Sequence, residues 1–439
     1  MITKTMACLF AIFLLLPFVA EAKVYIDLAA PQAKKLPIAI QDFKPLGEGA
    51  RTTDPAIARL GAELVDTLRS DIRFSGLFNI IEKDAYLEDA ALSGLTEDKI
   101  EFRLWRAIGA DTLIKGGFSI EKDKLVVEVR LFDSVTEKQV LGKKYIGSLA
   151  NPRRVMHYFA DNLYEELTGR KGIFTTRIMF VSNRDGNKEI YVADYDGRNA
   201  LKVTRNKSIN LSPQWSPDGR KALYVSYKRG WPSLFQLDLT NGQDSAVSAK
   251  PGINIGGRYS PDGTRVALTL SGDKSPELYT LDLSTLEYRR LTDNYGIDVS
   301  PAWSPDSSRI AYVSDVAGNP HIFMLELATG AARRLTFEGR YNSSPAWSPD
   351  GSKIAFSRSD SGRFNIWVMN ADGGGATQLT FDGNDRSPSW SPDGRYLIYS
   401  STAKGVSALR VMRSDGTGSM KVETGTGNEK SPVWSPYLQ

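Results

Sequence analysis

The sequence has very few of the residues that most enzymes and metalloproteins use for chemistry. Its 439 residues include one cysteine, Cys8, and two histidines, His157 and His321. Cys8 stands before an N-terminal apolar stretch, the wrong place for a lipidation site, and the rest of the chain can form no disulfide or cysteine metal site. Neither histidine has a partner at metal-ligand spacing. We expect His157 to pack in a helix beside Tyr158 and Phe159, and His321 to be a loop residue.

Catalytic motifs are also missing. The sequence has no Gly-x-Ser-x-Gly nucleophile elbow and no His-Glu-x-x-His zinc motif. Gly116-Gly117 follows a predicted strand, but no Lys-Ser/Thr comes after it, so we interpret the pair as a strand irregularity. No catalytic residue, metal site or cofactor is predicted, and binding is the function that remains.

No charge of one sign dominates, and no long apolar run follows the N-terminus. The chain has 55 Lys and Arg against 51 Asp and Glu, a net charge of +4, with no three basic residues in a row. This argues against binding nucleic acid or a polybasic membrane patch. Residues 1–22 are typical of a secretory signal cleaved after Ala22. The predicted mature chain begins at Lys23, has no transmembrane segment and is a monomer.

The most informative feature present is a repeat. Six times, an aromatic residue leads into Ser-Pro, and the prolines are 43 or 44 residues apart, at Pro217, Pro261, Pro305, Pro349, Pro392 and Pro436. A period of this length is typical of a propeller or solenoid. Pro-Asp-Gly, which follows most of the aromatics, predicts a turn rather than a calcium loop. Each repeat therefore predicts a four-stranded blade, with a short inner strand ending at the aromatic and three longer strands after it.

The repeat is permuted, which predicts how the ring closes. Residues 177–182 resemble a second strand without a first, and Trp434-Ser435-Pro436 resembles a first strand without a second. Pairing the two completes a sixth blade and leaves no open edge. We therefore predict a six-bladed propeller over 172–439, closed by its C-terminal strand. We expect the repeated aromatics to be wedges between blades.

Residues 35–170 lack this rhythm and predict a small α/β (α+β) sandwich domain. Strands are expected at 36–40, 77–81, 111–118, 125–132 and 138–149, with a hairpin turn at 121–123. Helices are expected from Asp54 as N-cap to about Arg69, from Glu97 to Ile108, and from Pro152 to Leu167. Residues 23–34 would form a separate N-terminal tail.

Candidate binding residues lie where each outermost strand connects to the next innermost strand. These connections must share one face of the propeller, beside the mouth of the axial channel, and we expect exposed loops there, including Asp298 and Arg386. An alternative is that they are ordinary solvated turns. The candidate residues are Asn210, Ile253, Asn254, Asp298, Val299, Tyr341, Asn342, Asn384, Asp385, Arg386, Asn428 and Glu429.

Taken together, the sequence resembles the TolB family, the periplasmic propeller component of the Tol–Pal system of Gram-negative bacteria. The resemblance rests on three features: the start Lys23-Val24-Tyr25-Ile26-Asp27, the junction from Leu167 to Arg177, and the ending from Pro432 to Leu438. It covers nearly the whole chain.

The resemblance implies a non-catalytic interaction hub. It implies that the propeller mouth binds the peptidoglycan-associated lipoprotein Pal, and that the N-terminal segment binds the C-terminal domain of TolA. It also implies roles in outer-membrane integrity and cell division, and exploitation of the mouth by bacteriocins; outer-membrane lipoproteins are further candidate partners. The TolA-binding residues by position are Lys23, Val24, Tyr25, Ile26, Asp27 and Leu28, which alternate like a strand added to a partner sheet.

Two other interpretations stay open at this point. Similar blades occur in prolyl-oligopeptidase-type peptidases, although the hydrolase domain that such an enzyme needs is missing here. A propeller can also bind glycans or other ligands at its mouth.

Overall fold

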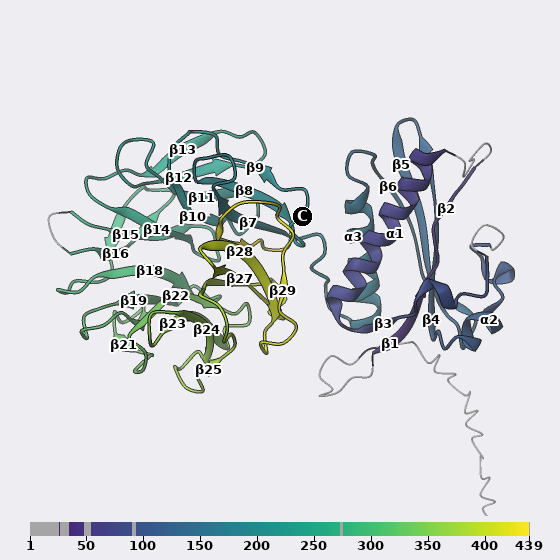
Figure 1. Ribbon diagram of the computed structural model, residues 1–439. Coiled ribbons are helices and arrows are strands. Elements are labelled where there is room, and N and C mark those ends of the chain that lie inside the picture. The colour runs from purple at the N-terminus through teal and green to yellow at the C-terminus, as the bar shows by residue number, and fades with distance from the viewer. Residues whose placement is uncertain (1–25, 27–34, 48–53, 90–93, 273–274, 439) are drawn as a thin grey trace, which may run out of the picture. The chain divides into compact units, whose positions relative to one another are not determined.

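The computed structural model describes residues 26, 35–47, 54–89, 94–272 and 275–438, and the chain divides into two compact units (Figure 1). The first contains residues up to Phe159 and Leu163–Arg170, and the second contains Ala160–Asn162 and the chain from Lys171 onward. The predicted fold class is confirmed: a small α/β unit comes first and a six-bladed propeller second.

The first unit is built on one mixed sheet with the strand order β3-β1-β4-β5-β6, in which β2 also pairs with β4. β1 is parallel to both of its neighbours, and β4, β5 and β6 form an antiparallel meander. The predicted hairpin between β4 and β5 is present, and its turn is made by Lys122 and Asp123, both with positive φ. The strands are β1 (Leu36–Ile40), β2 (Lys44–Pro45), β3 (Phe78–Ile80), β4 (Thr112–Glu121), β5 (Lys124–Asp133) and β6 (Lys138–Ser148).

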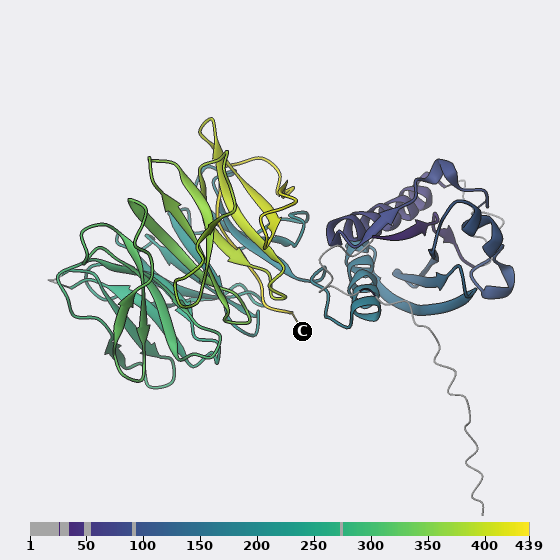
Figure 2. The same ribbon diagram turned by 90° about the horizontal axis from the view of Figure 1, so that it is seen from below.

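Two long helices lie side by side on one face of this sheet, α1 (Pro55–Ser75) and α3 (Pro152–Thr168) (Figures 1 and 2). Asp54 caps α1 by accepting a hydrogen bond from the Ala56 amide, and Asn151 caps α3 in the same way. The predicted end of α1 near Arg69 is wrong. The helix continues to a left-handed Gly76 because Ile72 and Ser75 are still buried against the unit's core.

The predicted helix from Glu97 to Ile108 is also wrong in part. A 3₁₀ turn (Glu97–Lys99) is separated from the short helix α2 (Phe102–Ala107) by the extended residue Ile100. The reason is packing: Ile100 is buried in an apolar cluster with Trp105 and Phe132, and a continuous helix would carry it elsewhere.

Gly116 and Gly117 are not an irregularity, contrary to the prediction. The pairing of β4 with β5 runs without a break from Thr112 to Glu121. A Cβ atom at Gly116 would lie 2.6 Å from the Phe43 ring, and one at Gly117 would lie 2.7 Å from the Leu46 side chain. The glycines are there because the side chains of Phe43 and Leu46, which flank β2, cover β4 at close range.

The second unit contains six four-stranded antiparallel sheets arranged around an axis (Figure 1). The innermost strands are β10 (Asn210–Trp215), β14 (Asn254–Tyr259), β18 (Asp298–Trp303), β22 (Tyr341–Trp347), β26 (Asp385–Trp390) and β30 (Glu429–Trp434). The second strands are β11 (Lys221–Ser226), β15 (Arg265–Leu270), β19 (Arg309–Ser314), β23 (Lys353–Ser359), β27 (Tyr396–Ala403) and β7 (Arg177–Ser182). The third strands are β12 (Ser233–Asp238), β16 (Glu277–Asp282), β20 (His321–Glu326), β24 (Phe364–Asn370), β28 (Val406–Arg413) and β8 (Glu189–Asp194).

The outermost strands correct one expectation about the blade. They are β13 (Asp244–Ser248), β17 (Tyr288–Arg290), β21 (Ala332–Arg334), β25 (Thr377–Gln378), β29 (Met420–Lys421) and β9 (Leu201–Lys202). They are the short strands, whereas each innermost strand has six or seven residues. Both edge strands of a blade have a hydrogen-bonded partner on one side only, but the innermost strand also packs against the innermost strands of the neighbouring blades. The outermost strand lacks this support and pairs over only two to five residues.

The predicted closure of the ring is confirmed. The C-terminal strand β30 pairs antiparallel with β7, with Trp434 opposite Ile178 and Glu429 opposite Ser182. The sheet order β30-β7-β8-β9 therefore joins the two ends of the propeller sequence in one blade.

The predicted role of the repeated tryptophans as wedges is also confirmed. All five Trp side chains of the repeat are buried. The indole N–H of Trp303 donates to the Arg258 carbonyl at 3.1 Å, and that of Trp347 donates to the Ala302 carbonyl at 3.1 Å. Each of these bonds joins one innermost strand to the innermost strand of the preceding blade, so the indole fixes both spacing and orientation between blades.

Candidate binding face of the propeller

Strand direction decides which connections share a face of the propeller. Every innermost strand ends at Trp or Tyr, and within a blade each strand is antiparallel to the one before, as β14, β15, β16 and β17 illustrate. The turns between second and third strands therefore lie at the same end as the connections that enter the innermost strands. We call this end the entry face.

Exposed apolar side chains gather on the entry face. Of the twelve large hydrophobic side chains that are exposed in the described part of the propeller, nine lie there. Phe337 and Phe381, which occupy equivalent positions in adjacent blades, are 73% and 71% exposed, and Tyr295 is 84% exposed. The nine are Ile209, Tyr227, Trp231, Tyr295, Ile297, Phe337, Tyr341, Phe381 and Val406. Such a concentration on one face is typical of an interaction surface.

An aromatic–cation cluster joins two blades on this face. The Tyr341 ring meets the Phe364 ring edge-on, with centroids 5.5 Å apart. The Arg386 guanidinium, from the next blade, lies 3.6 Å from the centroid of the same Phe364 ring. Arg386 is exposed, as expected, and Tyr341 is 44% exposed, so the cluster offers both an aromatic edge and a cation to a partner.

The expectation of exposed loops is wrong for half of the candidate residues. The first polar residue of each blade entry is at most 3% exposed, and Asp298 is fully buried. The six are equivalent by position in their blades: Asn210, Asn254, Asp298, Asn342, Asp385 and Glu429. Several of these side chains bond groups of the connection itself: Nδ2 of Asn254 donates to the Lys250 carbonyl, and Nδ2 of Asn342 donates to the Glu338 carbonyl.

Blade-to-blade comparison shows what these buried groups do. Asn210 donates from Nδ2 to the Glu189 carboxylate at 2.8 Å, and Thr204 donates to the same oxygen. Two blades later, the equivalent residues are Glu277, Thr292 and Asp298. Asp298 takes the place of Asn210, so a second carboxylate lies near that of Glu277. Burial, together with the charge of Glu277, raises the pKa of Asp298 above its ordinary value.

His321 is not a loop residue, contrary to the sequence-based expectation. It begins strand β20 and is 3% exposed. Its Nδ1 lies 3.2 Å from the Thr336 hydroxyl and 3.1 Å from Nδ2 of Asn342, and its Nε2 lies 2.7 Å from the Arg334 guanidinium. Burial and the charge of Arg334 lower the pKa of His321, so the imidazole is neutral at physiological pH.

The other candidate residues lie nearer the surface. Ile253, Val299, Asn384 and Asn428 are all partly exposed. The Asn384 side chain accepts a hydrogen bond from the Phe364 amide, and that of Asn428 accepts one from the Ser407 amide. The two asparagines therefore tie the entry connection to the adjacent turn of the same blade.

Sequence reasoning missed the exposed aromatics of the entry face. Trp231, Tyr295, Phe337 and Phe381 lie outside the candidate set, which contains only residues at or just before the start of each innermost strand. A signal was present: Leu-Thr-Phe occurs twice, at 335–337 and 379–381, and the repeat framework gives the phenylalanine no core position.

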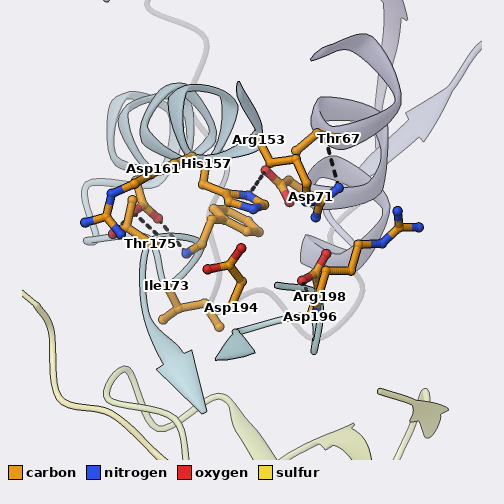
Figure 3. Close-up of polar contacts among 12 residues, drawn as sticks. Thr67, Asp71, Arg153, His157, Asp161, Ile173, Thr175, Asp194, Asp196 and Arg198 are labelled. Atoms are coloured by element: carbon orange, nitrogen blue, oxygen red, sulfur yellow. Dashed lines mark hydrogen bonds and ion pairs between the residues drawn. The ribbon is translucent and has the colours of Figure 1, made fainter. Parts of the chain in front are cut away.

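In the first unit, polar contacts join α1 to α3 (Figure 3). His157 Nδ1 lies 2.8 Å from the Asp71 carboxylate, and Arg153 donates to the Thr67 hydroxyl at 3.1 Å. All four residues are buried. His157 is thus buried, as expected for packing, but it is held by a carboxylate rather than only by aromatic neighbours.

Asp161, also shown in Figure 3, anchors the start of the propeller segment. Its carboxylate accepts hydrogen bonds from the Phe174 amide at 2.8 Å and from both the amide and the hydroxyl of Thr175. This carboxylate therefore fixes part of the junction motif from which the family resemblance was drawn.

The predicted TolA-binding tail lies outside the described residues, with the exception of Ile26. This side chain is 7% exposed, and its backbone N–H donates to the Leu167 carbonyl at 2.7 Å. One point of the tail is therefore docked on the last turn of α3.

Within the described residues, no cluster of three or more His, Cys, Asp or Glu has a geometry that could hold a metal ion. None of the helices described is both long enough and apolar enough to cross a membrane.

Comparison with known proteins agrees with the architecture of both units. A model of the TolB β-propeller domain matches residues 164–438, and a model of the TolB amino-terminal domain matches residues 24–140. The Tol-Pal system protein TolB of Desulfosudis oleivorans is 41% identical over 212 residues, which are 48% of this chain and 47% of that protein. That of Syntrophotalea carbinolica is 42% identical over 198 residues, 45% of each chain. The matched part thus spans about half the length of these relatives.

A solved structure extends the comparison to nearly the whole chain. The crystal structure of TolB from Acinetobacter baumannii has a TM-score of 0.79 and 28% sequence identity, and the match covers 94% of this chain and all of that one. Since the propeller model alone matches more than half of the sequence, the chain belongs to the TolB family of Tol-Pal system proteins.

Proposed function

We propose that this protein is a non-catalytic periplasmic adaptor of the Tol–Pal system, binding Pal on the entry face and the C-terminal domain of TolA through residues 23–28. It would thereby contribute to outer-membrane integrity and to constriction during division, and bacteriocins would use the same face. Family membership supports the system, and the fold supports two separate binding regions.

The observation that carries the Pal assignment is the crowding of nine exposed apolar side chains onto the entry face. A side chain such as Phe337 gains about 1.5–3 kcal/mol when it is buried by a partner. A few such anchors account for most of the affinity of a typical protein interface.

The proposed contact set is refined by burial. Side chains near the surface are offered to Pal directly, whereas the buried polar residues at the strand starts hold those loops in place. The proposed direct contacts from the first set are Ile253, Val299, Tyr341, Asn384, Arg386 and Asn428, with the newly found aromatics added.

Calorimetry with purified Pal tests the assignment. Phe337→Ala and Phe381→Ala should each weaken binding by about 10- to 100-fold, the equivalent of the lost burial. Leu286→Ala is the matched control, because Leu286 is 66% exposed in a turn on the opposite face. Equal loss in the control, or no loss in either Phe variant, would refute the entry face as the Pal site.

The TolA part of the proposal rests on the tail. Residues 23–28 alternate like a strand, and Ile26 is docked on the protein itself through Leu167. The segment cannot pair with a strand of TolA while it is docked on α3 of its own chain. We therefore infer that the tail exchanges between a docked state and a TolA-bound state. Occupancy of the entry face can alter this exchange only through different affinities for the two tail states.

Titrating TolA into the protein with and without saturating Pal tests the coupling separately from the binding. Deleting residues 23–34 should abolish TolA binding and leave Pal binding at least as tight. It should lower the melting temperature slightly, because the buried Ile26 side chain and its hydrogen bond to Leu167 are lost. Equal TolA dissociation constants in the two titrations would mean that tail and face are independent.

A further inference from the structure

One repeat departs from the others at the propeller axis. Five innermost strands carry Ser-Pro, one variable residue and then Trp, but strand β14 carries Gly256-Gly257-Arg258-Tyr259. The variable residue elsewhere is small or uncharged: Gln214, Ala302, Ala346, Ser389 or Val433. Arg258 is thus the one charged side chain among the six equivalent positions.

These positions line a cavity of about 320 Å³, to which all six innermost strands contribute. A cavity of this size is at the lower end of the range for small-molecule sites, about 300–1,000 Å³. Among the described residues that line it, Arg258 is the only charged one. The lining also contains a ring of serines, Ser212, Ser300, Ser344, Ser387 and Ser431.

The serine ring has an unusual backbone that all six blades share. The five serines have φ between +51° and +56°, and Gly256 takes the sixth place with φ +71°. Each sits at an irregularity in the pairing of its innermost strand with the second strand. None of the five hydroxyl groups has a hydrogen-bond partner within the described part of the chain, so each is available as a donor.

The Arg258 charge has no counter-ion within the described residues. The guanidinium makes one hydrogen bond, from Nη1 to the carbonyl of the adjacent Gly257 at 3.3 Å. Burial lowers the pKa of Arg258 to about 10, which leaves the group protonated at neutral pH. The Arg258 side chain is partly exposed within the cavity, and most of its guanidinium donors are unused by the protein, so they are free to bind an anion.

We propose that the axial cavity is a binding site for a small carboxylate, held by the planar fork of Arg258 and by hydroxyl groups of the serine ring. A guanidinium matches the two oxygens of a carboxylate with two parallel N–H···O bonds, and hydroxyl donors suit the remaining lone pairs. The site does not depend on which protein docks on the entry face.

Calorimetric titration of the full chain with malonate, at neutral pH and constant ionic strength, tests the site. The wild type should show saturable one-to-one binding. Arg258→Gln should bind at least tenfold more weakly and should fold, because Gln214 already occupies the equivalent place in the neighbouring blade. Arg258→Lys, which keeps the charge but loses the fork, should fall between the two. Arg363→Gln, in an exposed turn, is the matched control and should bind like the wild type.

Three results would overturn the proposal. They are no saturable binding of malonate by the wild type, equal affinity in Arg258→Gln, and sulfate binding as tight as malonate, which would remove the carboxylate assignment. If Arg258→Gln failed to fold, Arg258→Lys would provide the test instead. Wild-type malonate affinity in Arg258→Lys would then refute the proposal, because lysine lacks the planar fork.

Discussion

Replacing Asp298 with asparagine should stabilise this protein, although it removes a buried charged group. Asp298 is fully buried, and its Oδ2 accepts a hydrogen bond from Asn294 at 2.8 Å while Oδ1 has no partner. Glu277 is close enough for its charge to raise the pKa of Asp298 further. Two carboxylates therefore share a site that water does not reach.

Asparagine already occupies the position equivalent to Asp298 two blades earlier, at Asn210. There Asn206 donates to Asn210, and Asn210 donates to Glu189 at 2.8 Å. Asp298→Asn should reproduce it: the Asn294 bond is kept, and the new amide donates to Glu277. One hydrogen bond to a charged group contributes about 1.5–3 kcal/mol, so we expect a gain of about 2 kcal/mol. For a unit of this size that corresponds to a rise in Tm of roughly 4–8 °C.

The pH dependence of the free energy of unfolding provides a second, independent test. Because its pKa is raised in the folded state, Asp298 contributes most to stability below its unfolded pKa, and that contribution is lost as the pH rises through the folded pKa. The advantage of Asp298→Asn should therefore be largest at neutral pH and shrink as the pH falls, because the raised pKa makes Asp298 take up its proton earlier than an ordinary carboxyl group.

Urea unfolding of both proteins at pH 8 and pH 4 measures these differences. Asn210→Asp is the matched control, since it places a carboxylate beside Glu189 and should destabilise the protein by a similar amount at pH 8. A less stable Asp298→Asn protein at pH 8, or an advantage that grows toward acid, would refute the assigned electrostatics.

Two further predictions concern closure and partner binding. Deleting residues 431–439, or replacing Trp434 with alanine, should destabilise the propeller, by about 3–5 kcal/mol for the single substitution, because the indole is 4% exposed and donates to Thr176. A Tm within a few degrees of wild type in differential scanning calorimetry would contradict the closure argument. Arg386→Glu should weaken Pal binding by tenfold or more in calorimetry with little change in Tm, because Arg386 is exposed on the entry face. Charge reversal at Asp298 should instead lower the Tm strongly, because it would leave a buried cation.

The sequence by itself determined the architecture of the propeller. The spacing of Trp-Ser-Pro counts the blades, and the missing first strand before Arg177 together with the surplus strand ending at Trp434 predicts the closure that β30 and β7 make. These features can be recognised because the same local pattern occurs six times in the sequence, so the copies can be aligned with one another. Caps at Asp54 and Gly169 are similarly local.

Only the tertiary structure decided which side chains at the blade entries reach solvent. Asp298 and Arg386 both stand at blade entries, yet one is fully buried and the other exposed, because the pleat of the innermost strand sends neighbouring residues to opposite sides. The axial cavity was equally invisible. Arg258 is one arginine among many in the sequence, and its place in the lining of the cavity became apparent only when six strands distant along the chain met at one axis.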